Sequence, residues 1–336
     1  DADGATSAAL MLLTLGDLGF SSVDFRIPDR FAEGYGLQPA LVDRLDDATA
    51  LIVTVDNGIS SHAGVARARE RGFDVLITDH HLPPAELPPA NAIVNPNLAS
   101  SSFPCKSLAG VGVAFYLLAA LGRALDNPAA VTNYLDLVAL GTVADLVRLD
   151  QPNRILVEQG LKRIRAGRCR PGIRALLDVA GVMPKAVTTA TLGFAVGPRL
   201  NAAGRLDDMS VGIECLLTDD FDTAMKDAQL LDSINSERRD IEATMREQAF
   251  AYVDKLGSQR WPACVCVYDA DWHQGVVGLI AARVRERCHR PVIAFARESD
   301  ELLKGSARSI QGVHVRDLLE AVHAVRPDMI VKMPDE

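Results

Sequence analysis

The sequence predicts an α/β protein in which a doubly wound, mostly parallel sheet domain is joined by a long helix to a second, smaller α/β domain. Two continuous apolar, β-branched runs, at 50–55 and 75–78, each end in acidic residues, as buried parallel strands of such a sheet do. Residues 219–256 form a polar run without glycine or proline, which predicts one long helix that bridges two domains. We expect domain limits at 1–215, 216–258 for the connecting helix, and 259–336.

The first 150 residues should alternate between helices and strands. Asp3 and Gly4, followed by Thr6 and Ser7, form a helix-capping pattern, so a helix should begin there and close near Gly16. The other expected elements are a loop at 28–37, strands at 50–55, 75–78 and 92–94, and helices at 61–71, 110–125 and 130–149.

The rest of the chain begins with a weakly patterned stretch and a glycine-rich segment, expected to be a loop, at 193–208. Beyond the long helix, strands and helices alternate again, which predicts the second α/β domain. Its expected elements are strands at 263–268 and 291–295, a helix at 275–287, a strand or loop at 303–309 and a helix at 315–325.

Composition is that of a soluble globular protein, with 336 residues of which 48% are hydrophobic and 24% charged. No apolar window is long enough for a membrane span and no signal peptide is visible, so no membrane partner is expected. Six scattered cysteines predict reduced thiols in a cytoplasmic protein. Because Asp1 begins inside a motif, we expect a strand upstream of it.

The charge distribution leaves the kind of partner open. A net charge of −9 taken alone argues against nucleic acid, but many of the acids sit at strand ends where divalent metal ions would neutralise them. The segment 154–174 carries seven basic residues and one glutamate. Such a run is either a solvated helix face or a surface for nucleic acid.

Acidic residues gather where the predicted strands end, because the carboxyl ends of parallel strands share one edge of a sheet. The triplet Asp79-His80-His81, taken alone, is more often a satisfied polar pair than a site. Four or five carboxylates brought together would repel one another and require cations, and an oxygen-rich set with imidazole suits two Mn²⁺ or Mg²⁺ ions. Such a pair favours in-line displacement at phosphorus. The residues concerned are Asp1, Asp3, Asp56, Asp79, His80 and Asp145.

These motifs resemble a known family. DADG at 1–4, VTVDNG at 53–58, TDHH at 78–81 and GTVADL at 141–146 are similar to motifs I to IV of the DHH phosphoesterase superfamily. Four further segments resemble the RecJ branch of this superfamily: RFAEGYG at 30–36, PRLNAAGR at 198–205, DWHQGVVG at 271–278 and KGSARS at 304–309. Members of that branch are single-strand-specific 5′→3′ DNA exonucleases with DHH and DHHA1 domains. Family members carry a glycine-glycine-histidine motif near the end of this region that is not found here, which implies an incomplete second domain.

The resemblance implies a role for each matched residue around two Mn²⁺ or Mg²⁺ ions. Asp1 and Asp3 would each hold one ion, Asp56 would bridge both, and His80 and Asp145 would complete the second ion. His81 would touch the scissile phosphate, with Asp79 and Asn57 as supports. The DNA-binding residues implied are Arg30 and Tyr35 near the 5′ end, Arg199, Asn201 and Arg205 along the strand, and Gln274, Gly275, Ser306 and Arg308 in the second domain, the last two for a terminal 5′-phosphate.

The predicted function is therefore a metal-dependent 5′→3′ exonuclease that degrades single-stranded DNA to mononucleotides in DNA recombination and repair. The partners expected are single-stranded DNA with a 5′ end, single-strand-binding protein and a helicase. Two alternatives remain open: a DHH phosphodiesterase for short oligonucleotides or cyclic dinucleotides, and a non-catalytic DNA-binding replication factor of the same fold.

Overall fold

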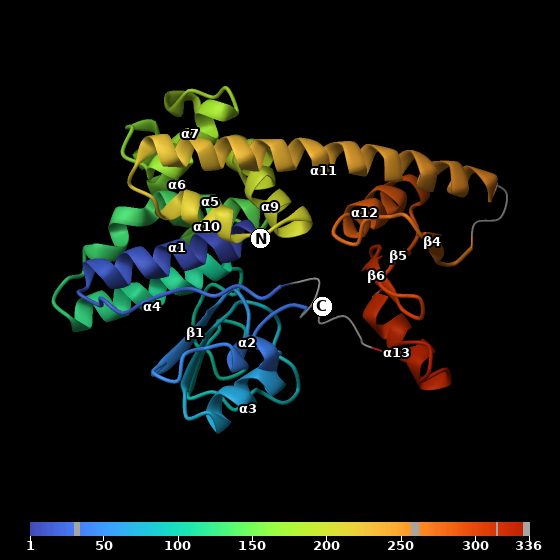
Figure 1. Cartoon of the computed structure of the whole chain (residues 1–336), viewed down its shortest axis with the longest axis horizontal. Coiled ribbons are helices and arrows are strands. Elements are labelled where there is room, and N and C mark those ends of the chain that lie inside the picture. The colour runs from blue at the N-terminus through green and yellow to red at the C-terminus, as the bar shows by residue number, and fades with distance from the viewer. Residues whose placement is uncertain (30–33, 257–261, 314, 332–336) are drawn as a thin grey trace. The chain divides into compact units, whose positions relative to one another are not determined.

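A computed structural model describes residues 1–29, 34–256, 262–313 and 315–331. The chain divides into two compact units, Asp1–Asn235 and Ser236–Glu336 (Figure 1). The boundary between them falls inside α11 (Phe221–Lys255), which confirms the predicted long helix. The domain limits expected at 215 and 258 stay a prediction.

The first unit contains a parallel sheet of three strands, β1 (Leu51–Val55), β2 (Asp74–Thr78) and β3 (Ala92–Val94), in that order. In β1 and β2, Leu51 pairs with Asp74 and Val55 with Thr78, so both strands end at the same edge. The helix α3 (His62–Glu70) connects them along the chain. The predicted α/β fold with a parallel sheet is confirmed.

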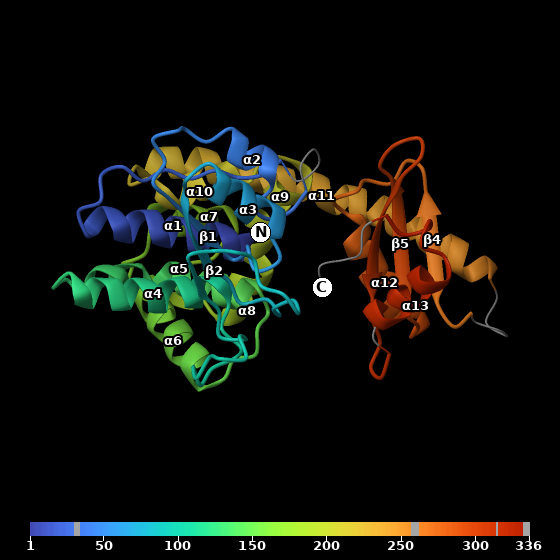
Figure 2. The same ribbon diagram turned by 90° about the horizontal axis from the view of Figure 1, so that it is seen from below.

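Helices make up the rest of the first unit. The helix α1 (Ala2–Asp17) packs against α4 (Gly110–Ala124), α5 (Leu135–Ala144) and α10 (Ser210–Leu217) (Figure 2), and their apolar side chains share one core. Its remaining elements are α2 (Pro39–Asp43), η1 (Ala130–Tyr134), α6 (Gln151–Arg165), α7 (Pro171–Val179), η2 (Pro184–Ala186), α8 (Thr189–Thr191), η3 (Leu192–Val196) and α9 (Gly197–Leu206).

The predicted helix at 130–149 is wrong in its extent. A 3₁₀ turn occupies 130–134, and α5 ends at Ala144, with Asp145 as its C-terminal cap. Leu146 follows in a left-handed conformation with φ 64°, which no helix can continue through. Asp145 therefore lies at a helix end and not inside the helix.

The glycine-rich loop predicted at 193–208 is also wrong, because residues 193–206 are helical. A π-helical turn, η3, runs directly into α9. The glycines serve close packing against α5: a Cβ on Gly197 would lie 3.1 Å from Cβ of Ala144, and one on Gly193 would lie 3.3 Å from Cγ1 of Val143.

The second unit is a small α/β structure, as predicted. Its strand β4 (Val265–Asp269) pairs in parallel with β5 (Val292–Arg297), which pairs antiparallel with β6 (Leu303–Arg308). The helices α12 (Val277–Cys288) and α13 (Val315–Val325) belong to the same unit. Trp272 Nε1 donates a hydrogen bond of 2.8 Å to Gln248 Oε1, which ties the second half of α11 to this unit.

The basic segment 154–174 lies on α6, α7 and their connection, where several of its cations bind backbone. Arg163 donates to the Asn133 carbonyl, and Arg165 to the Val187 carbonyl. Arg170 donates to the carbonyls of residues 216–218 and pairs with Asp219. These contacts favour a structural role for much of the run.

Two further expectations concern the cysteines and the membrane. All six cysteines are free thiols, and Cys105, Cys215 and Cys288 are buried. Within the described residues, no helix combines the length and apolar character needed to cross a bilayer.

Candidate metal centre

The turn after β1 presents Asp56. This residue has φ 58°, in the left-handed region that residues other than glycine rarely adopt. Two hydrogen bonds hold the turn: the Thr54 hydroxyl donates to the Asn57 carbonyl over 2.7 Å, and the Asn57 side-chain amide donates to the Val55 carbonyl over 2.8 Å. Asn57 thereby supports the backbone that carries Asp56.

The turn after β2 is organised by Asp79, which is fully buried. Its Oδ2 accepts the Ile59 N–H over 2.9 Å, and its Oδ1 accepts the N–H groups of His80 and His81 and the His81 Nδ1–H over 2.7, 3.1 and 2.6 Å. Burial alone would raise the pKa of Asp79, but the hydrogen bond and charge of His81 and the backbone donors keep it below its usual value. Asp79 is therefore an ionised anchor for the His81 imidazole and for the backbone that carries both histidines.

Two asparagines that the sequence analysis did not single out hold the same turn from the far side. Asn95 Nδ2 donates to the His81 carbonyl over 2.9 Å, and Asn97 Nδ2 donates to the His80 carbonyl over 2.6 Å. Both follow β3, the neighbour of β2 in the sheet. Side-chain amides directly after a predicted strand are the signal that could have identified them.

Asp3 is bound by the beginning of α4. Its Oδ2 accepts the Gly110 N–H over 2.6 Å and its Oδ1 accepts the Val111 N–H over 2.9 Å, where the helix dipole favours negative charge. The side chain is only 1% exposed, and burial raises the pKa of Asp3 against the lowering effects of His80 and these two donors. The helix cap expected at Asp3 is wrong: Asp1 caps α1 by accepting the Gly4 N–H.

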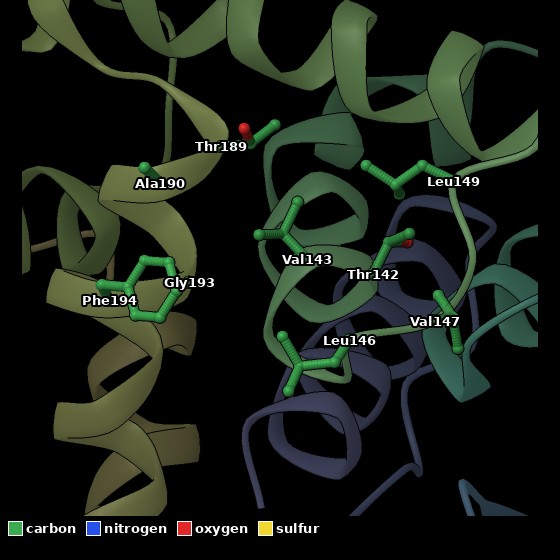
Figure 3. A pocket seen from close by; sticks show the side chains of 9 residues that line it. All are labelled: Thr142, Val143, Leu146, Val147, Leu149, Thr189, Ala190, Gly193 and Phe194. Carbon is green, nitrogen blue, oxygen red and sulfur yellow. The ribbon is translucent and has the colours of Figure 1, made fainter. Parts of the chain in front are cut away.

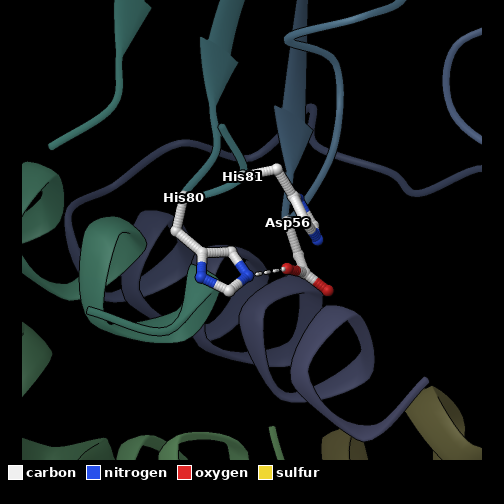
Figure 4. Close-up of side chains that lie close together, drawn as sticks. All are labelled: Asp56, His80 and His81. Carbon is white, nitrogen blue, oxygen red and sulfur yellow. Dashed lines mark ion pairs between the residues drawn. The ribbon is translucent and has the colours of Figure 1, made fainter. Parts of the chain in front are cut away.

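Three carboxylates surround Nε2 of His80. Asp56 Oδ1 lies 3.2 Å from it, Asp145 Oδ2 3.7 Å and Asp3 Oδ2 3.9 Å (Figure 4 shows the contact with Asp56). The ring of His81 lies beside that of His80, with centroids 4.4 Å apart. Segments that are more than 140 residues apart in the sequence thus meet at one imidazole nitrogen.

This arrangement fits divalent cations. Burial and the negative charge of Asp3 raise the pKa of Asp56 well above its usual value. The buried Asp56 Oδ1 and His80 Nε2 also lack hydrogen-bond partners within the described part of the chain. Two overlapping groups have ligand atoms close enough to share an ion: Asp56, His80 and His81, and Asp3, His80 and Asp145. Carboxylate oxygens with imidazole nitrogen suit Mn²⁺ and Mg²⁺.

Asp1 lies at the border of this group. A Cβ on Gly4 would be 3.8 Å from Asp1 Oδ1 and 3.5 Å from Asp56 Oδ2, so both carboxylates lie close to the Cβ side of Gly4. Asn201 Oδ1 accepts the Ala2 N–H over 2.7 Å and fixes the first turn of α1 from α9. The roles assigned to single ligands stay predictions.

The predicted DNA-binding residues of the first unit have different surroundings. Arg30 lies outside the described residues, and Tyr35 is 55% exposed. Arg199 pairs with Asp232 of α11 over 2.8 Å and donates to the Ala195 carbonyl. Arg205 lies on α9, half-buried.

The predicted residues of the second unit gather at the beginning of α12 and on β6. Arg308 Nη1 donates to Ser306 Oγ over 3.1 Å, and a Cβ on Gly278 would lie 3.1 Å from both side chains. Burial, and then the positive charge of Arg285, lower the pKa of Arg308. Gln274 donates to the Arg297 carbonyl, and Gly275 is buried just before the helix.

Comparison with known proteins identifies two domains in this chain. The model described as "DHH family, N-terminal domain" matches residues 1–142, and the DHHA1 domain model matches 262–328. The single-stranded-DNA-specific exonuclease RecJ of Escherichia coli (strain K12) is 54% identical over 345 residues, which cover 99% of this chain and 60% of the relative.

Solved structures are similar over nearly the whole chain. A crystal structure of exonuclease RecJ bound to manganese has 35% identity and a TM-score of 0.80, with 95% of this chain and 78% of that chain covered. RecJ in complex with Mn²⁺ from Thermus thermophilus has 32% identity and a TM-score of 0.81, with 96% and 46% covered. The chain spans about 60% of the length of the first curated relatives it matches.

Proposed function

Because this chain belongs to the RecJ family of single-stranded-DNA-specific exonucleases, we propose that it degrades single-stranded DNA from the 5′ end to mononucleotides with two bound divalent metal ions. The observation that carries the proposal is the group of Asp3, Asp56 and Asp145 around Nε2 of His80. Such a group of buried carboxylates is stable as anions only when cations neutralise it.

The ions proposed are Mn²⁺ or Mg²⁺, with Asp1 and Asp3 each on one ion, Asp56 between them, and His80 and Asp145 on the second. Asp56 suits the bridging position because it has a ligand atom close to those of His80 and His81 and also lies, with Asp1, beside the Cβ position of Gly4. When bound, the ions would polarise the scissile phosphate and lower the pKa of the attacking water.

The protein's own groups would orient the substrate phosphate. Asp79 holds the His81 ring through Nδ1, and this fixed ring would contact a phosphate oxygen. Asn57, Asn95 and Asn97 hold the two turns that carry these side chains, so the ligands are positioned before substrate arrives.

The 5′→3′ polarity is proposed to come from the second unit. Ser306 and Arg308 form a hydroxyl and guanidinium pair suited to a terminal phosphate. Burial, and then the positive charge of Arg285, lower the pKa of the half-buried Arg308. A bound phosphate dianion would offset the repulsion between the two guanidinium groups. Gln274 and Gly275 would close over the strand next to this pair.

Along the strand, Arg30 and Tyr35 would contact the 5′ end, and Arg199, Asn201 and Arg205 would line its path. Stacking and backbone contacts of this kind tolerate any sequence, as a degradative enzyme requires. We place the protein in the cytoplasm, in recombination and repair, with single-strand-binding protein and a helicase as partners.

End-blocking tests the proposal. A labelled single strand of tens of nucleotides is incubated with the chain and Mn²⁺, with either its 5′ or its 3′ end blocked. We expect a block at the 5′ end to stop release of mononucleotides, a block at the 3′ end to have no effect, and a chelator to abolish activity. Degradation of the 5′-blocked strand would contradict the polarity, and consumption of dinucleotides alone would identify a phosphodiesterase for short oligonucleotides.

Asp145→Ala tests the metal centre separately. Turnover should fall by at least about a hundredfold while DNA binding stays measurable by fluorescence polarisation. Glu158→Ala, which removes an exposed carboxylate on α6, is the matched control and should cleave like the wild type. Equal cleavage by the two variants would rule out Asp145 as a ligand, and a wild type that binds the strand but never cuts it would identify a DNA-binding factor.

A further inference from the structure

An apolar pocket of about 270 Å³ opens between the end of α5 and the segment that contains α8 and η3 (Figure 3). Val143, Leu146 and Val147 line one side, and Gly193 and Phe194 line the other. The residues of the described chain that line it are all uncharged. A phosphate group would therefore find no cation there, whereas a flat apolar ring would find two suitable walls.

Two of the lining side chains are unusually exposed for their size. Phe194 is 81% exposed and Leu146 is 80% exposed, and neither belongs to a core cluster of the described residues. Leu146 projects from a backbone with φ 64°, which a leucine rarely adopts. Phe194 projects from a π-helical turn, and both features are typical of functional sites.

The pocket is joined to the candidate metal centre through the backbone. Leu146 directly follows Asp145, whose Oδ2 lies 3.7 Å from His80 Nε2. The opposite wall is held against α5 by the close approach of Gly197 to Ala144. That wall continues into α9, where Asn201 holds the N–H of Ala2. Both walls are therefore fixed relative to the carboxylates.

We propose that this pocket binds one nucleobase of the DNA strand, next to the phosphate held at the metal centre, by stacking of the base on Phe194 against Leu146. The inference rests on the proposed function, because it assigns the pocket to the same substrate. An apolar lining recognises the faces of a base and not its hydrogen-bonding edges, so all four bases should be accepted.

Abasic scanning tests the base site. In a set of 5′-phosphorylated strands of about 12 nucleotides, within the span that one single-strand-binding site covers, one abasic residue is moved stepwise from the 5′ end, and kcat/KM is measured with Mn²⁺ for each strand. With the wild type, one abasic position near the first cleaved bond should lower kcat/KM by about 5- to 150-fold, the range for loss of one stacked base.

Substitutions at the pocket complete the cycle. Phe194→Ala should lower kcat/KM on the intact strand by a similar factor and should be insensitive to the abasic residue at that position. Phe194→Tyr, which keeps the aromatic face, should behave like the wild type, and Phe194→Leu should behave like the alanine variant. Met183→Ala removes a 73% exposed apolar side chain elsewhere in the unit and is the matched control. Circular dichroism checks that all variants fold.

Two outcomes would overturn the inference, and they differ from failure of the proposed function. If the wild type degrades intact DNA but no abasic position matters, or if Phe194→Ala keeps the full abasic effect, the base site is wrong while the exonuclease assignment stands. If the wild type neither binds nor degrades the intact strand, the proposed function itself fails, and the base site fails with it.

Discussion

Gly110→Ala is a sharp test of how the metal centre is built, because Gly110 contacts two of its carboxylates at once. Its N–H donates to Asp3 Oδ2 over 2.6 Å. A Cβ at this position would lie 2.6 Å from Cβ and from Oδ1 of Asp56, and 2.9 Å from its Cα. Asp56 already has a left-handed backbone, so it has little freedom to move away.

The magnitude follows from two opposing effects. Alanine in place of glycine inside a helix stabilises by up to about 1 kcal/mol, whereas overpacking against backbone costs about 1–3 kcal/mol. Gly16→Ala in α1 isolates the first effect, because nothing lies within 4 Å of the added Cβ. The free energies of unfolding of the two variants should therefore differ by about 1–3 kcal/mol, with Gly110→Ala the less stable.

Urea unfolding of both variants without metal measures that difference, and calorimetric titration with Mn²⁺ measures the effect on the site. Displacement of Asp3 and Asp56 by Gly110→Ala should weaken Mn²⁺ binding about 10- to 100-fold, and Gly16→Ala should leave it unchanged. Equal stability and equal Mn²⁺ affinity in the two variants would refute the view that α4 and the β1 turn meet without room for a methyl group.

Two further substitutions test the supports of the fold. Asp79→Asn should remove stability that depends on the ionised carboxylate. Because the pKa of Asp79 is lowered in the folded chain, that stability is complete above the unfolded pKa of about 4 and is lost as pH falls below it. Urea unfolding at several pH values should therefore show the free energies of unfolding of the wild type and of Asp79→Asn converging in acid. Arg170→Ala leaves backbone carbonyls unpaired and should lower the free energy of unfolding by about 1–3 kcal/mol. Arg168→Ala, at an exposed position, should change it by less than about 0.5 kcal/mol. Equal effects of the two substitutions would contradict the structural role of Arg170 and leave a nucleic-acid surface as the interpretation of the basic segment.

The strands, the long helix and the gathering of acids could be predicted because each rests on a local pattern. The runs at 50–55 and 75–78 are apolar and β-branched, and parallel strands must end together, which brings Asp56 and His80 to one edge. The run at 219–256 lacks any residue that would end a helix. These inferences need no knowledge of distant contacts.

The errors arise where a distant contact decides the role of a residue. Asp1 and Asp3 both suit a helix cap, and the cap falls to Asp1 while α4, 107 residues later, binds the Asp3 carboxylate through two N–H donors. The glycines at 193 and 197 resemble a loop because their use, close packing on α5, is invisible in the sequence. Asn95 and Asn97 directly follow a predicted strand, which makes them candidates, but their partners, the carbonyls of His81 and His80, are visible only in the structure.

The wide separation of the residues around His80 has a consequence for synthesis of the protein. A nascent chain that ends before Asp145 lacks one of the three carboxylates, and one that ends before Asn201 leaves the Ala2 N–H without its acceptor. Metal ions that bind the completed group add to the stability of the folded chain and not of its fragments. A partly synthesised chain of this design would therefore lack a complete metal-binding group, and metal ions could stabilise the fold only after the segment that carries Asn201 had been made and folded.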